Sequence, residues 1–163
     1  TIGKGAVIVA EAARRANVPA LFVGEGPAES AIRAANPDAE IRGWVAPEEV
    51  AGLIASRARV LLAPSRWPET GPLTVYEAMA VGVPAIGSTT SGAAEKIVDG
   101  STGFVVEPNV EAVAEALARA FPIEAARLLG AAAYDHYWRN APTPANHAAA
   151  LFALYHDMLA RGP

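Results

Sequence analysis

The stretch Pro64-Ser-Arg-Trp-Pro-Glu69-Thr-Gly-Pro-Leu-Thr-Val-Tyr-Glu77-Ala-Met-Ala-Val-Gly82-Val-Pro84 decides how the chain is organised. An aliphatic run at 60–62 predicts a short buried strand, and the loop after it is rich in proline and glycine. The segment 73–81 predicts a helix that ends at Gly82 and is apolar on nearly every side, so we expect it to be largely buried. Glu77 is the only ionisable group of this helix, and Glu69 stands in the loop before it.

The start of this helix has the character of an anion site. Gly71-Pro72 is expected to open it, because proline suits the first helical position and glycine lets a ligand approach closely. The free N–H groups of Leu73, Thr74 and Val75 would then point out of the helix start. The segment offers carboxylates for hydroxyl groups and N–H groups for phosphate, and a nucleoside diphosphate sugar carries both kinds of group. A plain helix boundary with a hydrogen-bonded glutamate explains the spacing equally well.

Length and composition limit the class of protein. The chain has 163 residues, which predicts one domain with a proper core. A hydrophobic content of 52% and a net charge of −4 argue against disorder and against a nucleic-acid partner. The absence of cysteine excludes disulfides and thiolate chemistry and suits the cytoplasm. We therefore expect a cytoplasmic domain, with peripheral attachment at the inner membrane surface through another domain as an option.

Strands that alternate with helices predict an α/β fold: an open, doubly wound parallel sheet with helices on both faces. The expected strands cover 20–24, 40–43, 60–62, 83–87 and 103–107. The expected helices cover 5–16, 27–35, 47–57, 73–81, 92–98, 110–120, 123–139 and 145–160. The carboxyl ends of the strands should gather the loops along one edge of the sheet.

Further short motifs accompany the central stretch. In chain order they are Lys4-Gly5, Val23-Gly-Glu-Gly-Pro27, Ile41-Arg-Gly43-Trp-Val45, Pro64-Ser65, Ser91-Gly92-x-x-Glu95 and Asp99-Gly100-x-x-Gly103. Together with Glu69-x7-Glu77, followed by Ala-Met-Ala-x-Gly-x-Pro, they resemble the donor site of the family 4 (group 1) glycosyltransferases, retaining two-domain enzymes of the GT-B fold. The resemblance covers about residues 2–120. It departs at Gly71-Pro72, where the family often has Phe-Gly.

The resemblance implies that the chain is the donor-binding half of such an enzyme. An N-terminal domain and a first strand would precede it in the parent chain, residues 1–122 would form the Rossmann-like core, and the helices of 123–163 would pack toward the N-terminal domain. The implied reaction moves a hexosyl group from a UDP-, GDP- or ADP-sugar to an unknown acceptor (glycan, lipid-linked or small molecule), with retention of configuration and without a metal or other cofactor. The isolated chain is expected to be inactive. A non-catalytic nucleotide-sugar-binding or regulatory module of the same fold stays open.

The resemblance also implies roles for single residues. Lys4 would reach the diphosphate and Glu69 the sugar, and these two form the catalytic set, while Glu77 would bind the ribose. The other substrate-binding positions would be Gly71, Leu73, Thr74, Val45, Gly24, Gly26 and Ser91. Blander interpretations remain: a solvated Lys4, a tight turn at the two glycines, Trp44 beside Val45 as core, and Ser91 as a helix N-cap. NAD binding is disfavoured, because Glu29 stands where the third glycine of a dinucleotide fingerprint would be.

Overall fold

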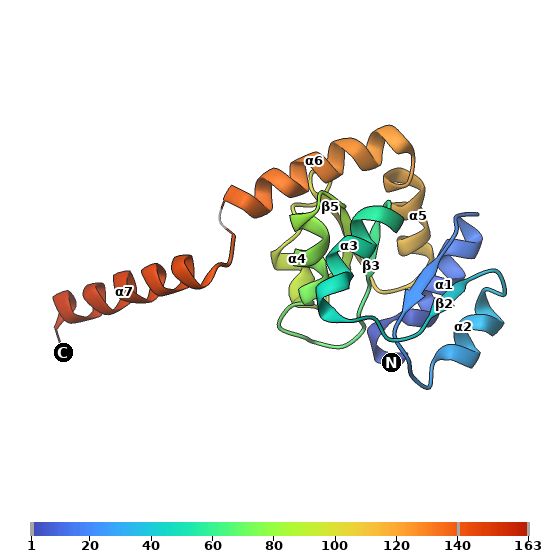
Figure 1. Ribbon diagram of the computed structural model, residues 1–163, viewed down its shortest axis with the longest axis horizontal. Helices are drawn as coiled ribbons and strands as arrows, with labels where there is room; N and C mark the ends of the chain where they lie inside the picture. Colours follow the sequence, from blue (N-terminus) through green and yellow to red (C-terminus); the bar gives the residue numbers. More distant parts are fainter. Residues whose placement is uncertain (1, 140, 163) are drawn as a thin grey trace.

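The computed structural model describes residues 2–139 and 141–162 (Figure 1). Its strands are β1 (Leu21–Val23), β2 (Glu40–Arg42), β3 (Leu61–Ala63), β4 (Ala85–Ser88) and β5 (Gly103–Val106). Its α-helices are α1 (Ala6–Arg15), α2 (Glu29–Ala35), α3 (Pro47–Arg57), α4 (Leu73–Ala80), α5 (Val110–Ala120), α6 (Ile123–Arg139) and α7 (Pro144–Arg161). Two 3-10 helices, η1 (Ile2–Lys4) and η2 (Gly92–Glu95), complete the elements of the described chain.

All strand pairs are parallel, which confirms the predicted fold class. Strand β1 pairs with β2, with Leu21 opposite Glu40. Strand β4 lies between β3 and β5, with Leu61 opposite Ala85 and Ala85 opposite Gly103. The two ladders are separate sheets in the described chain, because β1 and β3 are not hydrogen-bonded to each other. The parallel order is therefore as expected, but it is interrupted between β1 and β3.

Helices cover both faces of these strands. Helix α1 lies between α2 and α5, and α4 lies between α3 and α6, which gives two helical layers around the strands. One apolar cluster joins Ala12 of α1 to Ile86, Phe104 and residues of α5. A second, built around Met79, packs α4 against the other side of β4. All four residues of β4 are buried, as expected for a strand with neighbours on both edges and helices on both faces.

One predicted helix, at 92–98, is wrong. The segment forms only the 3-10 helix η2, in which the N–H of Lys96 donates to the Ala93 carbonyl at 3.0 Å. The Thr102 hydroxyl then accepts the N–H of Val98 at 2.8 Å, and this bond turns the chain toward β5. A side-chain hydrogen bond to the backbone has replaced the next helical turn.

Helix α4 ends as predicted but is less buried than predicted. Gly82 adopts a φ of 75° just after the helix, and the N–H of Val83 returns to the Ala78 carbonyl at 2.9 Å, which forms a Schellman motif. Val75, Ala78 and Met79 are buried. Leu73 is 74% exposed, however, so one side of the helix start faces outward. Tertiary packing covers only part of a helix whose sequence is apolar nearly all round.

The last two helices behave differently. Helix α6 packs on α4, where the Tyr76 and Tyr137 rings lie 5.9 Å apart and Trp138 Nε1 donates to the Ala80 carbonyl at 3.2 Å. Helix α7 projects away from the other elements in Figure 1, and none of its residues is buried. Its apolar side chains, such as Phe152 at 67% exposure, remain open. Among the described residues, no helix combines the length and apolar character needed to cross a bilayer.

Gly130 of α6 allows the close approach of α6 to the turn after α4. A Cβ at this position would overlap the Gly82 carbonyl oxygen and meet Pro84 Cδ at 3.3 Å. Gly130→Ala should therefore lower the free energy of unfolding by about 1–3 kcal/mol, although alanine is the better helix former. Gly52→Ala in α3 is the matched control, because nothing lies within 4 Å of a Cβ there, and it should stabilise by roughly 0.5–1 kcal/mol. Denaturant unfolding of both variants measures the difference, and equal gains would contradict the packing argument.

Candidate functional site

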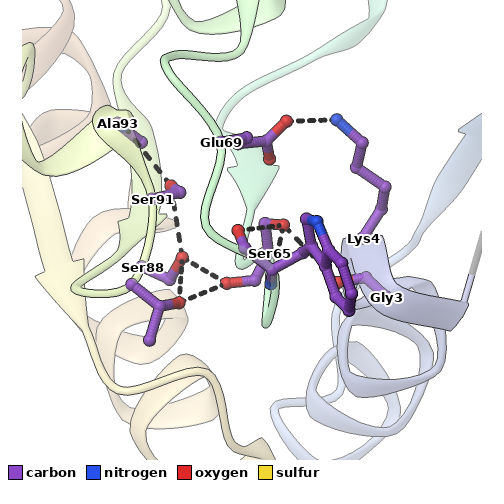
Figure 2. A network of polar contacts seen from close by, with 9 residues as sticks. Gly3, Lys4, Ser65, Glu69, Ser88, Ser91 and Ala93 are labelled. Atoms are coloured by element: carbon purple, nitrogen blue, oxygen red, sulfur yellow. Dashed lines mark hydrogen bonds and ion pairs between the residues drawn. The ribbon is translucent and has the colours of Figure 1, made fainter.

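Polar groups gather where β3 and β4 end. The Ser65 carbonyl, just after β3, accepts hydrogen bonds from the hydroxyls of Ser88 and Thr90, each at 2.6 Å. The Ser88 hydroxyl also lies 3.3 Å from the Ser91 hydroxyl (Figure 2). Ser65, Ser88 and Ser91 are buried. These bonds hold the loops after β3 and β4 together at the carboxyl edge of the sheet, where doubly wound folds bind their ligands.

The N-terminal turn packs onto the same edge. The Gly3 carbonyl accepts the N–H of Arg66 at 2.9 Å. Gly5 has a φ of 79° and is buried, and a Cβ there would overlap the Pro64 carbonyl oxygen. Only glycine suits both the left-handed backbone and this close contact. The turn therefore places Lys4 directly beside the loop that carries Glu69.

Lys4 and Glu69 form an ion pair between their Nζ and Oε2 atoms (Figure 2). The lysine side chain is 59% exposed and the glutamate side chain only 17% exposed. The two residues that the resemblance assigned to the catalytic set are thus brought together from positions 65 apart. An ion pair this open to water contributes only about 0–1 kcal/mol to stability. Its effect is to hold an accessible ammonium group at a defined place.

The loop that carries Glu69 is anchored through its backbone. The N–H of Gly92 donates to the Glu69 carbonyl at 2.7 Å. Gly92 lies so close to the loop that a Cβ would overlap the Thr70 carbonyl oxygen. Gly71 adopts a φ of 147°, which residues other than glycine rarely adopt. The departure from the family's Phe-Gly at Gly71-Pro72 therefore has a local backbone reason. Ser91-Gly92 thereby sets the position of Glu69.

Lys96, the second lysine of the chain, lies behind this loop. Its Cε is 3.8 Å from where a Cβ of Gly71 would be, and its ammonium is 5.6 Å from the centre of the Tyr76 ring. The Tyr76 hydroxyl raises the pKa of Lys96, Glu95 adds to the rise, and partial burial opposes it. Lys96 is therefore a fixed positive charge at neutral pH.

The N-terminus of α4 differs in detail from the prediction. Pro72 precedes the helix as its N-cap instead of opening it. The N–H of Val75 is not free, because it donates to the Pro72 carbonyl at 3.1 Å. Within the described chain the N–H groups of Leu73 and Thr74 have no backbone acceptor outside the helix, so two of the three expected donors remain. The third donor, the N–H of Val75, is occupied within the tight first turn of the helix.

Glu77 lies further along α4 and is half-buried. No hydrogen bond or ion pair reaches its carboxylate from residues 2–139 or 141–162, and no buried polar side-chain atom there lacks a partner. The structure therefore does not support the alternative in which Glu77 is hydrogen-bonded within the protein. Thr74 and Glu77 are separated by three positions on a helix and so share one side of it.

The predicted positions on the first two strands form a separate group. Gly24 and Gly26 follow β1 with φ values of 112° and 159°, and the Gly24 N–H donates to the Arg42 carbonyl at 3.0 Å. Val45 is buried, whereas Trp44 is 71% exposed, which excludes Trp44 as core. Within the described residues, no side-chain hydrogen bond links this group to Lys4 or Glu69.

Ser91 serves as the N-cap of η2, since its hydroxyl accepts the N–H of Ala93 at 3.3 Å. This is one of the two interpretations left open by the sequence, and its role toward a substrate stays a prediction. No motif of the sequence predicts a separate role for Thr90 or Ser88. The run of hydroxyl residues directly after an apolar strand was the available signal. No group of three potential metal-ligating side chains occurs in the described part of the chain.

A cavity of about 890 Å³ lies between the two sheets. Lys4 and Thr74 line it, but the other predicted site residues do not. Because the remaining lining is mostly apolar, we do not assign the donor to this cavity.

The anchoring of Glu69 by Gly92 is testable. Gly92→Ala should push the loop away, since the new methyl group would overlap the Thr70 carbonyl oxygen, and the amide at position 92 should then exchange with solvent much faster. Gly3→Ala is the control in the same region, because a Cβ there meets nothing within 4 Å. Hydrogen exchange resolved by NMR measures both. Unchanged protection at position 92 would show that the loop is not held in this way.

Comparison with known proteins gives the family. The chain matches the family described as "Glycosyl transferases group 1" over residues 5–121. It is 43% identical over 72 residues to an exopolysaccharide phosphotransferase of Streptomyces coelicolor, of which it covers only 8%.

Solved structures of similar fold are larger than this chain. A sucrose-phosphate synthase of Thermosynechococcus elongatus superposes with a TM-score of 0.78 at 25% identity, over 99% of this chain and 44% of that one. The Anabaena protein HepE, in complex with UDP-glucose, superposes with a TM-score of 0.72 at 20% identity, over 85% of this chain and 42% of its own. The chain thus spans less than half the length of these relatives. By its sequence match and its fold, it belongs to the group 1 glycosyltransferases.

Proposed function

We propose that this domain binds the nucleoside diphosphate sugar in a retaining, family 4 glycosyltransferase of two domains. The acceptor site is then on the N-terminal domain of the same parent chain, and catalysis takes place between the two. The observation that carries the proposal is the Lys4–Glu69 pair beside the start of α4. The complex of HepE with UDP-glucose supports the class of donor.

The diphosphate is assigned to Lys4 and the N–H groups of Leu73 and Thr74. Lys4 is exposed enough to meet an anion, and the positive end of α4 adds to its field. Negative charge grows on the diphosphate as the sugar leaves it, so these fixed donors stabilise the transition state more than the ground state. In this proposal the charge of the donor is met without a metal or other cofactor.

The two glutamates are assigned to opposite ends of the donor. Glu69 precedes α4, whereas Glu77 lies about 6 Å beyond Leu73 along the axis, at 1.5 Å per residue. The diphosphate at the helix start separates the nucleoside from the sugar. Glu77, without a protein partner in the described chain, can accept from the ribose hydroxyls, and Glu69 can accept from the sugar while it holds Lys4.

Glu77→Ala should weaken binding of the nucleoside diphosphate. A hydrogen bond to a charged group contributes about 1.5–3 kcal/mol, so affinity should fall by roughly one to two orders of magnitude. The donor is first identified by a thermal-shift screen of UDP-, GDP- and ADP-glucose, because a bound ligand raises the melting temperature. Calorimetry on the variant then measures the loss.

Glu115→Ala in α5 is the control for this measurement, because Glu115 is exposed and α5 packs on α1 and β5. It should leave the affinity unchanged. If Glu77→Ala lowers stability while the folded protein keeps its affinity, Glu77 is structural and its assignment to the ribose fails.

Glu69→Ala should separate sugar recognition from nucleotide binding. If Glu69 binds the sugar, the variant keeps most of its affinity for the free nucleoside diphosphate and loses the extra affinity that the sugar adds. Calorimetry with the free nucleoside diphosphate and with the nucleotide sugar, on Glu69→Ala and on Lys4→Ala, distinguishes a sugar-binding role from a diphosphate-binding role. Lys4→Ala should weaken both ligands alike, because both carry the diphosphate.

An equal loss for both ligands in Glu69→Ala would show that the carboxylate acts only by holding Lys4. The assignment of Glu69 to the sugar would then be dropped. For the full activity, the parent polypeptide should transfer a hexosyl group and the 163-residue chain should not. Donor binding without turnover in the parent would favour a non-catalytic nucleotide-sugar-binding module.

A further inference from the structure

Trp67 is an exposed tryptophan in the loop that carries Glu69. The residue is 70% exposed. Trp138, by contrast, packs edge-on against Tyr137 at 5.1 Å, and its Nε1 donates to the Ala80 carbonyl. Within the described chain, the Trp67 ring has neither an aromatic nor a cationic partner, and its Nε1 donates no hydrogen bond. Packing within the domain therefore does not explain an indole at this position.

The backbone of Trp67 is nevertheless held firmly. Its N–H donates to the Ser65 hydroxyl at 3.3 Å, and the same hydroxyl lies within hydrogen-bond distance of the Trp67 carbonyl, at 3.2 Å. Ser65 is itself buried. Pro68 comes next, and a residue before proline is restricted to extended conformations. An indole on such a backbone, with only two side-chain torsions, offers a large contact area at little cost in conformational entropy.

Charged residues flank this indole in the folded chain. The Gly3 carbonyl accepts the N–H of Arg66, so the turn that carries Lys4 is bonded to the residue before Trp67. Glu69 stands two positions after Trp67 and pairs with Lys4 (Figure 2). Arg66 is exposed, and no ion pair reaches it from residues 2–139 or 141–162. One short segment thus combines an open aromatic ring with two cations and a carboxylate.

These surroundings discriminate between classes of ligand. A lipid chain or an apolar protein face would remove water from the charges of Arg66, Lys4 and Glu69 without offering them hydrogen bonds, which is costly. A pyranose ring has C–H groups on its face and hydroxyl groups around its edge. The face can stack on the indole while the hydroxyls bond to the charged groups, and aromatic surface with a few convergent polar groups is typical of small-ligand sites.

We propose that Trp67 is a stacking platform for a pyranose ring at the sugar end of the site. The proposal rests on the proposed function, in which Glu69 meets the sugar and the nucleotide lies along α4. Glu69 separates Trp67 from Gly71 and α4 in the chain, so the indole stands before the sugar carboxylate and the nucleotide contacts come after it. The ring belongs to the donor sugar or to a sugar of the acceptor, because both present the same chemistry.

NMR of the indole N–H groups tests the proposal, because the chain has three tryptophans and each gives one such signal. Spectra of Trp67→Phe and Trp44→Phe assign the signals by the one that disappears. The acceptor probes are maltotriose, cellotriose and chitotriose, and the donor probes are UDP-, GDP- and ADP-glucose beside the free diphosphates. At least one sugar should shift the Trp67 signal saturably, while the Trp138 signal, held by the Ala80 carbonyl, stays in place.

The probes separate the two sources of the ring. For the ring of the donor, a nucleotide sugar should shift the Trp67 signal and its free diphosphate should not. For a ring of the acceptor, a trisaccharide should shift the Trp67 signal in the presence of saturating nucleoside diphosphate.

The same spectra distinguish failure of this proposal from failure of the proposed function. Nucleotide binding is followed at the amides of Leu73 and Thr74. Shifts at these amides with no sugar effect at Trp67 would overturn the platform and leave the proposed function standing. Sugar shifts at Trp67 without any nucleotide effect on α4 would support the platform and contradict the assignment of the diphosphate.

Variants measure the contribution of the ring. Trp67→Ala should weaken binding of the responding sugar roughly tenfold, because the stacked contact is lost, whereas Trp67→Phe should retain part of the affinity. Trp44→Ala is the matched control, because Trp44 is exposed to nearly the same extent and also follows the carboxyl end of a strand. It should leave the contribution of the sugar to binding unchanged. Denaturant unfolding should show equal stability for Trp67→Ala and the unchanged chain, since the ring is exposed.

Three results would overturn the proposal. They are a Trp67 signal that no sugar shifts, an equal shift of the Trp44 signal by the trisaccharides, and an equal loss of sugar affinity in Trp44→Ala and Trp67→Ala. Titration with n-octanol completes the comparison. A Trp67 signal that octanol shifts and sugars do not would assign the indole to a lipid or a protein face instead.

Discussion

The contact between the N-terminal turn and the loop after β3 is the constraint on which the site depends. Gly5 lies against the Pro64 carbonyl, and the Gly3 carbonyl accepts from Arg66. On the other side of the same loop, the Ser65 carbonyl accepts from Ser88 and from a second hydroxyl of the loop after β4. One loop is thus held from two directions, and this anchoring also fixes the position of the residues that follow, including Glu69.

The charge that the site presents to solvent follows from the unequal exposure of the Lys4 and Glu69 side chains. Glu69 is mostly covered and Lys4 is mostly open, so the pair presents positive charge to solvent. Lys96 adds a second fixed cation behind the loop, and the hydrogen bond to Tyr76 is the main cause of its raised pKa. Because exposed pairs contribute little to stability, their arrangement is better explained by what they present to an anion. In the proposed donor site, these two lysines and the start of α4 would together favour a phosphate.

The interrupted sheet gives the domain an unusual distribution of burial. Its second half, from β3 to α6, packs two clusters, one around Ile86 and one around Met79, on the two sides of β4. The first half packs a smaller cluster around Ile32 and is joined to the second mainly through α1. Strands with an open edge and partly exposed apolar residues are less protected from local opening than β4. Lys4 lies at the boundary between the two halves. How well its side chain is ordered therefore depends on how the two halves are joined.

The sequence by itself determined the local features. The limits of α3, α5 and α6, the turn at Gly82 and the parallel α/β class follow from periodicity, capping residues and strand spacing, which act over a few positions. The family resemblance also assigned Lys4 and Glu69 to one predicted site, and the structure pairs their side chains. Only the tertiary structure decided that Val45 is buried and Trp44 exposed, that Gly92 anchors Glu69, and that the sheet is interrupted. These features depend on contacts between segments far apart in the chain, such as the 65 positions between Lys4 and Glu69, and no local pattern specifies which distant surface a segment will meet.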